Sequence, residues 1–352
     1  MARAERVAVA EGDALGRAAD ALSTASEVAL ACHVNPDADA LGSMLGLSAF
    51  LRARGVRTVC SYGNEPFEHP RWVQELPGSD ALVEPRSFPK APPVLVTLDC
   101  ASLDRLGQLA SVVPRAGTVV WIDHHASNEG LGTIPLIDPK ASSTAEMVYR
   151  LMERMGGDIP AEAAACLYAG VVTDTGRFQY EATTAETLRL AAELRRHPFD
   201  HARLAQALFE DNGLAYLGLL GTALRRVVFD EEVGLVWTYL TQADIQDSGI
   251  HPTETDDLID VVRTAREADV AAVLKQQRDG RFKVSMRSRG GADLAALAAR
   301  FGGGGHRLAA GFTGKAGVEE TIRQIADALR EQAAEGRGGP GGQQPRGAKR
   351  SG

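Results

Sequence analysis

The stretch VALACHVNPDADALGSMLGLSAFLRAR, residues 28–54, decides the fold of the first half of the chain. It opens with a short apolar run typical of a buried strand, and residues 39–54 carry apolar side chains at helical spacing. Strand-like runs follow at 56–62, 93–100 and 118–123. Strands that alternate with helices favour a mainly parallel sheet with helices on both faces. We therefore predict an α/β fold.

The second half repeats an α/β pattern after a helical stretch. Helical spacing is found at 143–155, 160–174, 184–196 and 201–226, and strand patterns at 234–240, 270–276 and 282–288. The last residues, 336–352, are rich in glycine and carry four basic residues and no acid, which is typical of disorder. We predict a catalytic domain at 1–195, a helical connector at 196–230, a smaller α/β domain at 231–335 and a disordered tail at 336–352.

The composition restricts the class of protein. The 352 residues contain no apolar run near the roughly 20 residues of a membrane span and no secretory signal pattern. The four cysteines are far apart, which argues against a disulfide framework or a zinc site. These features predict a cytoplasmic protein with no membrane partner. The sequence is compatible with a homodimer and does not decide the oligomeric state.

The net charge of −8 restricts the partners. Proteins that follow long nucleic acids usually carry basic grooves with many phosphate contacts. An acidic chain that is only 5% aromatic is therefore a poor candidate for long or duplex nucleic acid. A single local site for a small anion remains compatible with this charge.

The strongest local signal is HVNPDADALGS, residues 33–43. His33, Asp37 and Asp39 lie where a strand ends and a helix begins, the usual place for a site in an open α/β sheet. A carboxylate here can also cap the helix, worth about 0.5–2 kcal/mol. Taken alone, this motif leaves capping by Asp37 or Asp39 and a functional role equally open.

Three further acidic positions favour a metal site. Asp99 and Asp123 end predicted strands, and Asp174 ends an apolar helix, where a negative charge opposes the helix dipole. Carboxylates gathered at one sheet edge repel one another unless cations neutralise them. Oxygen ligands suit Mn²⁺ or Mg²⁺, and the histidines favour Mn²⁺. Two such ions roughly 3.5–4 Å apart can activate a nucleophile and stabilise a phosphoryl transition state.

These motifs carry a family resemblance. HVNPDADALGS, LDC, DHH and VVTDTG resemble the four motifs of the DHH phosphoesterase superfamily, and GGGGHRLAAGF resembles the signature of the accessory DHHA1 domain. The chain is most similar to the nano-RNA phosphodiesterases, which act on di- to pentanucleotides, on 3′-phosphoadenosine 5′-phosphate (pAp) and, in some relatives, on cyclic di-AMP. The resemblance implies a two-metal phosphoesterase that hydrolyses short nucleotides to mononucleotides.

The resemblance also implies roles for individual residues. Asp99 would bridge two divalent cations, and Asp123 would orient His124. His125 would face the substrate phosphate as a hydrogen-bond donor or proton carrier, and the roles of His124 and His125 are interchangeable at this level. One cation would be held by His33, Asp37 and Asp99, and the other by Asp39, Asp99, His124 and Asp174.

The second domain would bind the substrate. The glycine run before His306 would let backbone N–H groups approach an anion, although such a run can also be a flexible linker. Arg287 closes a strand, where its guanidinium could bind a phosphate in bidentate fashion or simply be solvated. The resemblance supports Arg287 and His306 as anchors. The predicted substrate-binding residues are Arg287, Ser288, Gly303, Gly304, Gly305 and His306.

Three other functions are compatible with parts of the sequence. Family II inorganic pyrophosphatases share the DHH motifs, but their basic SRKKQ-like motif is not found in this sequence. Single-strand exonucleases of the RecJ type are much longer and carry extra nucleic-acid-binding modules. A catalytically silent nucleotide-sensing module would be expected to have lost a ligand such as Asp99 or Asp174, and both are present.

Overall fold

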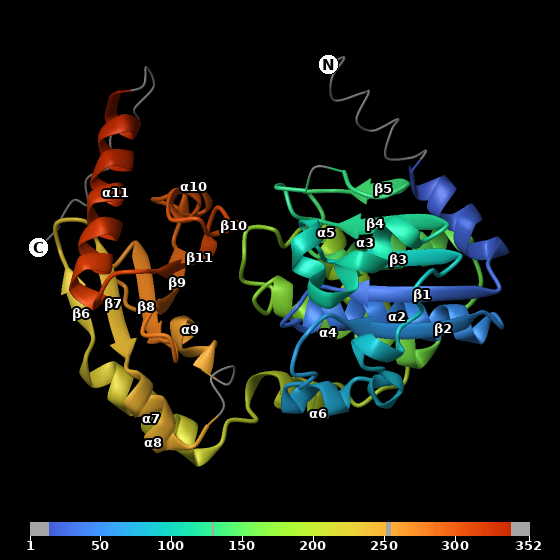
Figure 1. The fold of residues 1–352 in the computed structure, drawn as a ribbon, viewed down its shortest axis with the longest axis horizontal. Helices are drawn as coiled ribbons and strands as arrows, with labels where there is room; N and C mark the ends of the chain where they lie inside the picture. Colours follow the sequence, from blue (N-terminus) through green and yellow to red (C-terminus); the bar gives the residue numbers. More distant parts are fainter. Residues whose placement is uncertain (1–13, 129, 251–254, 339–352) are drawn as a thin grey trace, which may run out of the picture. The chain divides into compact units, whose positions relative to one another are not determined.

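A computed structural model describes residues 14–128, 130–250 and 255–338. The chain divides into two compact units between Asp211 and Asn212, and each unit is built on its own β-sheet (Figure 1). The predicted α/β fold, with a parallel sheet first, helices after it and a smaller second α/β part, is confirmed.

The first unit is organised by a five-stranded sheet in the order β2-β1-β3-β4-β5, in which every neighbouring pair is parallel. Alternate residues of β1 point to opposite faces. Leu30 packs into the core on one side, and Ala29 and Ala31 pack into the core on the other. Both faces are therefore buried, as expected for a parallel sheet. The strands are β1 (Glu27–Cys32), β2 (Arg57–Tyr62), β3 (Val94–Leu98), β4 (Thr118–Asp123) and β5 (Ile134–Ile137).

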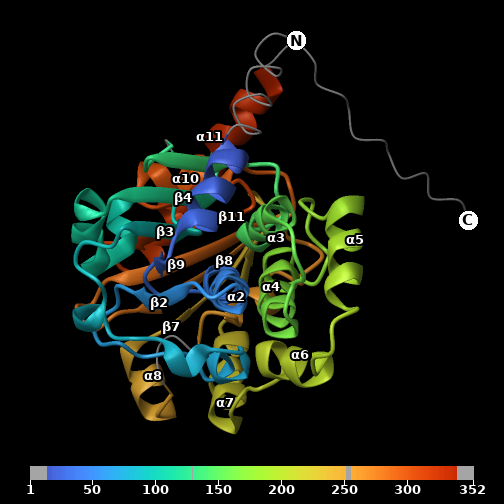
Figure 2. The same cartoon turned by 90° about the vertical axis from the view of Figure 1, so that its right-hand side faces the viewer.

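Helices cover both faces of this sheet. On one face, α2 (Ala38–Ala53), α3 (Thr144–Met155) and α4 (Ala161–Asp174) pack against one another, as Figure 2 shows. The 3₁₀ segment η4 (Leu103–Arg115) buries its apolar side chains with Trp121 on the opposite face. The unit is completed by α5 (Ala185–Leu194), α6 (His201–Phe209) and the short 3₁₀ helices η1 (Arg71–Glu75), η2 (Ser79–Ala81) and η3 (Pro85–Ser87).

Two glycines let α2 and α4 approach closely. A Cβ atom on Gly42 would lie 2.3 Å from the carbonyl oxygen of Cys166, and one on Gly170 would lie 2.6 Å from Oδ1 of Asp39. Because real Cβ atoms do not tolerate such distances, any larger residue would force the helices apart. This close crossing holds α4, which ends at Asp174, against the helix that begins beside Asp37 and Asp39.

The second unit contains a six-stranded sheet in the order β10-β11-β9-β8-β7-β6, in which β7 and β8 are parallel and the other pairs antiparallel. One apolar core includes side chains of α10 and α11, and another includes side chains of α7, α8 and α9. The elements are α7 (Leu214–Arg225), β6 (Val228–Asp230), β7 (Leu235–Leu240), α8 (Gln242–Ser248), α9 (Leu258–Val262), β8 (Val270–Gln276), β9 (Phe282–Ser288), α10 (Leu294–Arg300), β10 (Gly304–His306), β11 (Ala309–Gly314) and α11 (Val318–Gly338).

The structure differs from the sequence prediction at one helix and at several strands. The helix predicted at 201–226 is wrong, because α6 ends at Phe209 and α7 begins only at Leu214. The intervening Asp211, Asn212 and Gly213 are residues that favour turns. The strands β5, β6, β10 and β11 were not predicted. The first three have only three or four residues, which carry too little periodicity to be recognised, and β11 contains two glycines, which strands disfavour.

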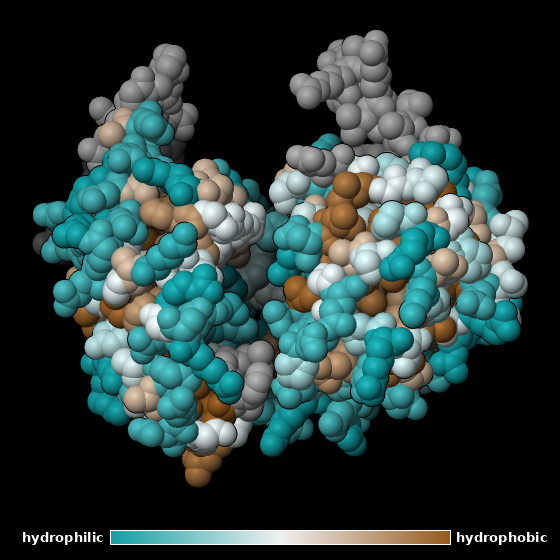
Figure 3. All heavy atoms as spheres, in the orientation of Figure 1, coloured by the Kyte–Doolittle hydropathy of each residue, from teal (hydrophilic) through white to brown (hydrophobic). Residues whose placement is uncertain are grey.

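The face seen in Figure 3 is mainly hydrophilic, with hydrophobic residues scattered over it. No helix among the described residues combines the length and the apolar composition that crossing a bilayer requires. The helix α11 extends to Gly338, and the rest of the predicted tail, 339–352, lies outside the described residues.

Candidate metal centre

Asp99 is the residue around which the predicted site residues of the first unit gather. It follows β3 with a left-handed φ of 56°, a conformation that Asp adopts more readily than most residues. Its Oδ2 lies 3.4 Å from Nε2 of His33, and its Oδ1 lies 3.7 Å from Nε2 of His124. The two oxygens of one buried carboxylate therefore face histidines from two different motifs.

His33 faces this centre from the end of β1. Its Nδ1–H donates a hydrogen bond of 2.8 Å to the carbonyl oxygen of Val34, which leaves Nε2 directed at the carboxylates. The same Nε2 lies 3.7 Å from Oδ2 of Asp37. A backbone carbonyl that fixes one ring nitrogen and exposes the other is the usual arrangement of a metal-binding histidine.

Asp37 combines the two roles that the sequence left open. Its Oδ1 accepts a hydrogen bond of 3.0 Å from the N–H of Ala40 and so caps α2. Its other oxygen, Oδ2, is the one that faces His33. Capping therefore occupies one oxygen of this carboxylate and leaves the second for a ligand.

Asp39, His124 and Asp174 lie on the other side of Asp99. The Nε2 atom of His124 is 3.3 Å from Oδ2 of Asp174, and the Nδ1–H of His124 points at the carbonyl oxygen of Ala141, 3.3 Å away. Single ligand atoms of Asp39, Asp99 and His124 all lie within 4.8 Å of one another. The group of His33, Asp37 and Asp99 meets the same distance limit.

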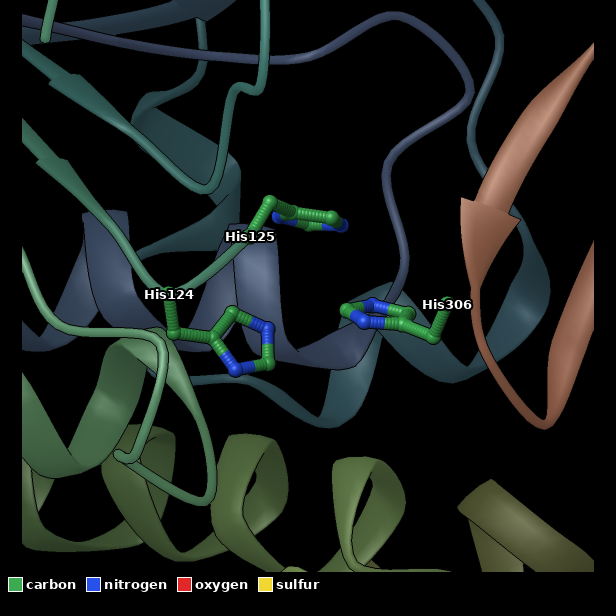
Figure 4. A group of neighbouring side chains, drawn as sticks. All are labelled: His124, His125 and His306. Atoms are coloured by element: carbon green, nitrogen blue, oxygen red, sulfur yellow. The ribbon is translucent and has the colours of Figure 1, made fainter. Parts of the chain in front are cut away.

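Asp123 pairs with His125, one of the two adjacent histidines between which the sequence could not decide. The Nδ1–H of His125 donates a hydrogen bond of 2.7 Å to Oδ1 of Asp123, and the Nδ2 of Asn128 donates one of the same length to Oδ2. The rings of His124 and His125 are inclined at 70° with centroids 5.0 Å apart (Figure 4). His124 therefore faces Asp174 and His125 faces Asp123, while a ring nitrogen of each also lies 3.7 Å from Oδ1 of Asp99.

The charges of this centre perturb its pKa values. Burial alone would lower the pKa of His33, but Asp37 and Asp99 outweigh it and raise the pKa to about 10. Burial likewise opposes protonation of His125, whose pKa is nevertheless raised to about 9, chiefly by Asp123. Burial and the charge of Asp99 raise the pKa values of Asp39 and Asp174. In the metal-free protein, protons on these histidines and acids therefore offset the repulsion between the crowded carboxylates.

The ligand atoms of this centre suit divalent cations. The donor set consists of carboxylate oxygens and imidazole nitrogens, which are ligands of Mn²⁺, Mg²⁺ and related ions. Both His33 and His124 present Nε2 to carboxylates while a backbone carbonyl faces their Nδ1. A cation would replace protons on the histidines and balance several carboxylates at once. The first unit therefore contains clusters that could bind divalent metal.

Sequence reasoning missed several residues beside the centre. Thr144 donates a hydrogen bond to Asp99, Asn128 donates one to Asp123, and Nη2 of Arg105 lies 3.1 Å from Nδ1 of His33. Ser143 and Glu146 have the spacing of a helix-capping box, which marks the helix start at Thr144 but does not reveal its contact with Asp99. Neither Asn128 nor Arg105 belongs to a pattern that sequence alone distinguishes.

In the second unit, the strand register relates two predicted substrate-binding residues. His306 on β10 and Arg287 on β9 both pair with Ala309 on β11, so their side chains project from the same face of the sheet. Arg287 is partly buried, and its Nε lies 3.8 Å from Oδ1 of Asp260. The Oγ of Ser288 accepts hydrogen bonds from the N–H groups of Gly290 and Ala292, which fixes the turn after β9.

The glycine run is a sheet edge and not a linker. Gly304 and Gly305 belong to β10, which pairs with β11. A Cβ atom on Gly303 would lie 2.1 Å from the carbonyl oxygen of Gly311, whereas one on Gly304 would meet no atom within 4 Å. Gly303 is thus required by packing, and the backbone at Gly304 is open to an approaching group.

Comparisons with known proteins identify the family. Residues 27–171 match the N-terminal domain of the DHH family, and residues 233–335 match the DHHA1 domain. The bifunctional oligoribonuclease and PAP phosphatase NrnA of Thermus thermophilus is 35% identical over 306 residues, covering 86% of this chain and 89% of that protein. The chain belongs to the DHH family.

Two further proteins are similar to most of this chain. The NrnA protein of Bacillus subtilis is 29% identical, covering 79% of this chain and 86% of its own. A solved structure of an exopolyphosphatase-related protein from Bacteroides fragilis superimposes with a TM-score of 0.84 at 25% identity, covering 92% of this chain and 97% of that one. The predicted family, fold and enzyme class are confirmed, and the chain is a nucleotide phosphoesterase of the DHH family.

Proposed function

We propose that this protein hydrolyses short oligoribonucleotides and pAp to mononucleotides with two divalent cations, Mn²⁺ foremost. The observation that carries the proposal is the cluster around Asp99, in which carboxylates and imidazoles from separate motifs converge. The NrnA relatives, named as oligoribonucleases and PAP phosphatases, match most of this chain and support the substrate class.

The proposed metal ligands form two groups, one on each side of Asp99. His33 and Asp37 would complete one cation site with Asp99. Asp39, His124 and Asp174 would complete the other. When bound, the cations supply a nucleophile that is active near neutral pH and positive charge for the phosphoryl transition state. The contribution of the protein is to hold the ligand atoms at fixed positions, as the backbone carbonyls facing His33 and His124 do.

His125 is the proposed proton carrier. Because Asp123 holds its Nδ1, a hydrogen bond or a proton for the leaving oxygen would come from Nε2. Asn128 donates a hydrogen bond to the other oxygen of Asp123, so both oxygens of this carboxylate are held. This arrangement resembles other carboxylate–histidine pairs in which the carboxylate orients the ring and stabilises its charged form.

The second unit is the proposed substrate-binding domain. Arg287 would bind a phosphate of the nucleotide, with His306 on the same face of the sheet and the open backbone at Gly304 contributing further contacts. The family matches at 27–171 and 233–335 support domain limits near 1–195 and 231–335. The amino-acid composition of the whole chain supports a cytoplasmic location for the enzyme.

Cyclic di-AMP is a second candidate substrate. The cyclic-di-AMP phosphodiesterase GdpP of Geobacillus thermodenitrificans is 26% identical over 88% of this chain. The match covers only 48% of that protein, so its activity transfers less directly than that of the NrnA relatives.

One assay tests the proposal. The metal-depleted protein is supplied in turn with Mn²⁺, Mg²⁺ and Ca²⁺ and given a dinucleotide, pAp, cyclic di-AMP and pyrophosphate. We expect Mn²⁺-dependent cleavage of the dinucleotide and pAp, no turnover by Asp99→Asn, and normal turnover by Asp104→Asn, which changes an exposed carboxylate nearby. Full activity in excess chelator, or cleavage of pyrophosphate alone, would contradict the proposal.

A further inference from the structure

The first turn of α3 contacts two of the proposed metal ligands at once. The hydroxyl of Thr144 donates a hydrogen bond of 2.9 Å to Oδ1 of Asp99. The N–H groups of Thr144 and Ala145 donate hydrogen bonds of 2.6 and 2.9 Å to the two oxygens of Asp39. All four residues are buried. One helix start therefore holds carboxylates that belong to two different motifs.

The start of α3 is itself fixed by side chains. Ser143 caps the helix by accepting a hydrogen bond of 3.1 Å from the N–H of Glu146. The carboxylate of Glu146 accepts hydrogen bonds from the N–H and hydroxyl of Ser142, and it also pairs with Arg150. Arg150 in turn donates a hydrogen bond of 2.8 Å to Asp138. The position of Thr144 is thus determined by a network that contains none of the proposed ligands.

The bond from Thr144 to Asp99 is not explained by helix formation. A threonine at a helix start usually bonds to its own helix, whereas this hydroxyl reaches a carboxylate 45 residues earlier in the chain. Asp39 is fixed through both oxygens by backbone N–H groups. Among the described residues, the Asp99 carboxylate by contrast accepts one side-chain hydroxyl bond, from Thr144, and otherwise faces histidines. Removing that hydroxyl should free the carboxylate to rotate.

We propose that Thr144 is a positioning residue that sets the rotation of the Asp99 carboxylate, so that one oxygen faces His33 and the other faces His124. The inference rests on the proposed metal centre but not on the choice of substrate. Partners that orient metal ligands typically contribute about 10- to 100-fold in metal affinity. We therefore expect the hydroxyl of Thr144 to matter for metal binding even before any substrate is present.

The test compares variants of the full chain after metal depletion. Thr144→Val removes the hydroxyl at nearly constant shape, Thr144→Ala removes it without adding a methyl group, and Thr144→Ser keeps it. Thr97→Val is the matched control, because Thr97 is a buried threonine on β3 whose hydroxyl has no hydrogen-bond partner among the described residues. Mn²⁺ binding is measured by the electron paramagnetic resonance signal of the unbound ion, and folding by circular dichroism.

We expect Thr144→Val and Thr144→Ala to weaken Mn²⁺ binding by about 10-fold or more, with Thr144→Ser and Thr97→Val within about threefold of the wild type. Wild-type affinity in both hydroxyl-free variants would overturn the proposal, as would equal loss in Thr144→Ser. Because Mn²⁺ binding is measured without substrate, this test does not depend on the proposed nucleotide hydrolysis, and either proposal can fail without the other. A wild-type protein that bound Mn²⁺ but cleaved no nucleotide would contradict the proposed function and leave the result on Thr144 standing.

Discussion

The Nδ1–H of His125 donates a hydrogen bond of 2.7 Å to Oδ1 of Asp123, two positions earlier in the chain. This bond, with the charge of Asp99, raises the pKa of His125 to about 9 against the opposing effect of burial. His125 is therefore protonated at neutral pH in the metal-free protein. Because the pKa is raised on folding, this group stabilises the fold fully below pH 6.5 and ceases to do so as the pH rises through about 9.

Replacing Asp123 tests this pair. In metal-free Asp123→Asn, the pKa of His125 should fall, because the negative charge that favours the imidazolium is gone. The ring protons of His125, followed by NMR from pH 5 to 10, should titrate near 9 in the wild type and at lower pH in the variant. With Mn²⁺ restored, kcat should fall by at least tenfold. Identical titration curves would show that Asp123 does not set the protonation of His125.

Arg287 should act on substrate affinity and not on metal content. If Arg287 binds phosphate as proposed, Arg287→Ala should remove a charge-assisted contact worth roughly 1.5–3 kcal/mol, or about 10- to 100-fold in KM for pAp. The matched control is Arg289→Ala, since Arg289 bonds to the carbonyl oxygens of Arg263 and Thr264. Bound Mn²⁺ is measured in parallel by elemental analysis. Loss of metal from Arg287→Ala, or an equal KM change in both variants, would remove Arg287 from the substrate site.

The glycine run offers a pair of neighbouring substitutions with different expected outcomes. Gly303→Ala places a methyl group against the carbonyl oxygen of Gly311 and should destabilise the second unit by about 1–3 kcal/mol. Gly304→Ala places it in open space and should change stability by less than about 0.5 kcal/mol. Urea unfolding of both variants measures these two changes in stability. If the open backbone contacts phosphate, Gly304→Ala should nevertheless raise KM, and an unchanged KM would limit the run to a packing role.

Substrate length provides a further test. Low aromatic content removes the stacking platforms that would add about 1–3 kcal/mol per base on a long strand. Affinity should therefore stop increasing after two or three nucleotides, and kcat/KM should fall steeply for longer RNA. The measurement uses RNAs from two to about 24 nucleotides at two salt concentrations, where few neutralised phosphates predict a weak salt dependence. A rate that rises with length and falls sharply with salt would indicate a long-strand nuclease.

The sequence predicted the parts of the site that follow from strand order. His33, Asp99 and Asp123 come at the carboxyl ends of parallel strands, which necessarily meet at one edge of the sheet. The partner of Asp123 stayed open between His124 and His125, because β4 ends at Asp123 and strand periodicity does not extend to the two histidines.

The contacts that sequence reasoning missed depend on packing between distant elements. Thr144 reaches Asp99 only because α3 packs beside α2 and β4, and no local pattern encodes that approach. The glycines that permit the α2–α4 crossing, Gly42 and Gly170, resemble ordinary helix residues in the sequence. The break between α6 and α7 was missed because the apolar spacing resumes after Gly213.

The buried acids around Asp99 have a consequence for the lifetime of the protein. Asp39, Asp99 and Asp123 lie inside the fold, where uncompensated charge is costly. A cation that binds only the folded chain shifts the unfolding equilibrium by mass action, by about 2.7 kcal/mol when its concentration is a hundred times its Kd. Chains without metal would then open more often and reach proteases sooner. The supply of divalent metal would thereby govern how much of this enzyme a cell retains.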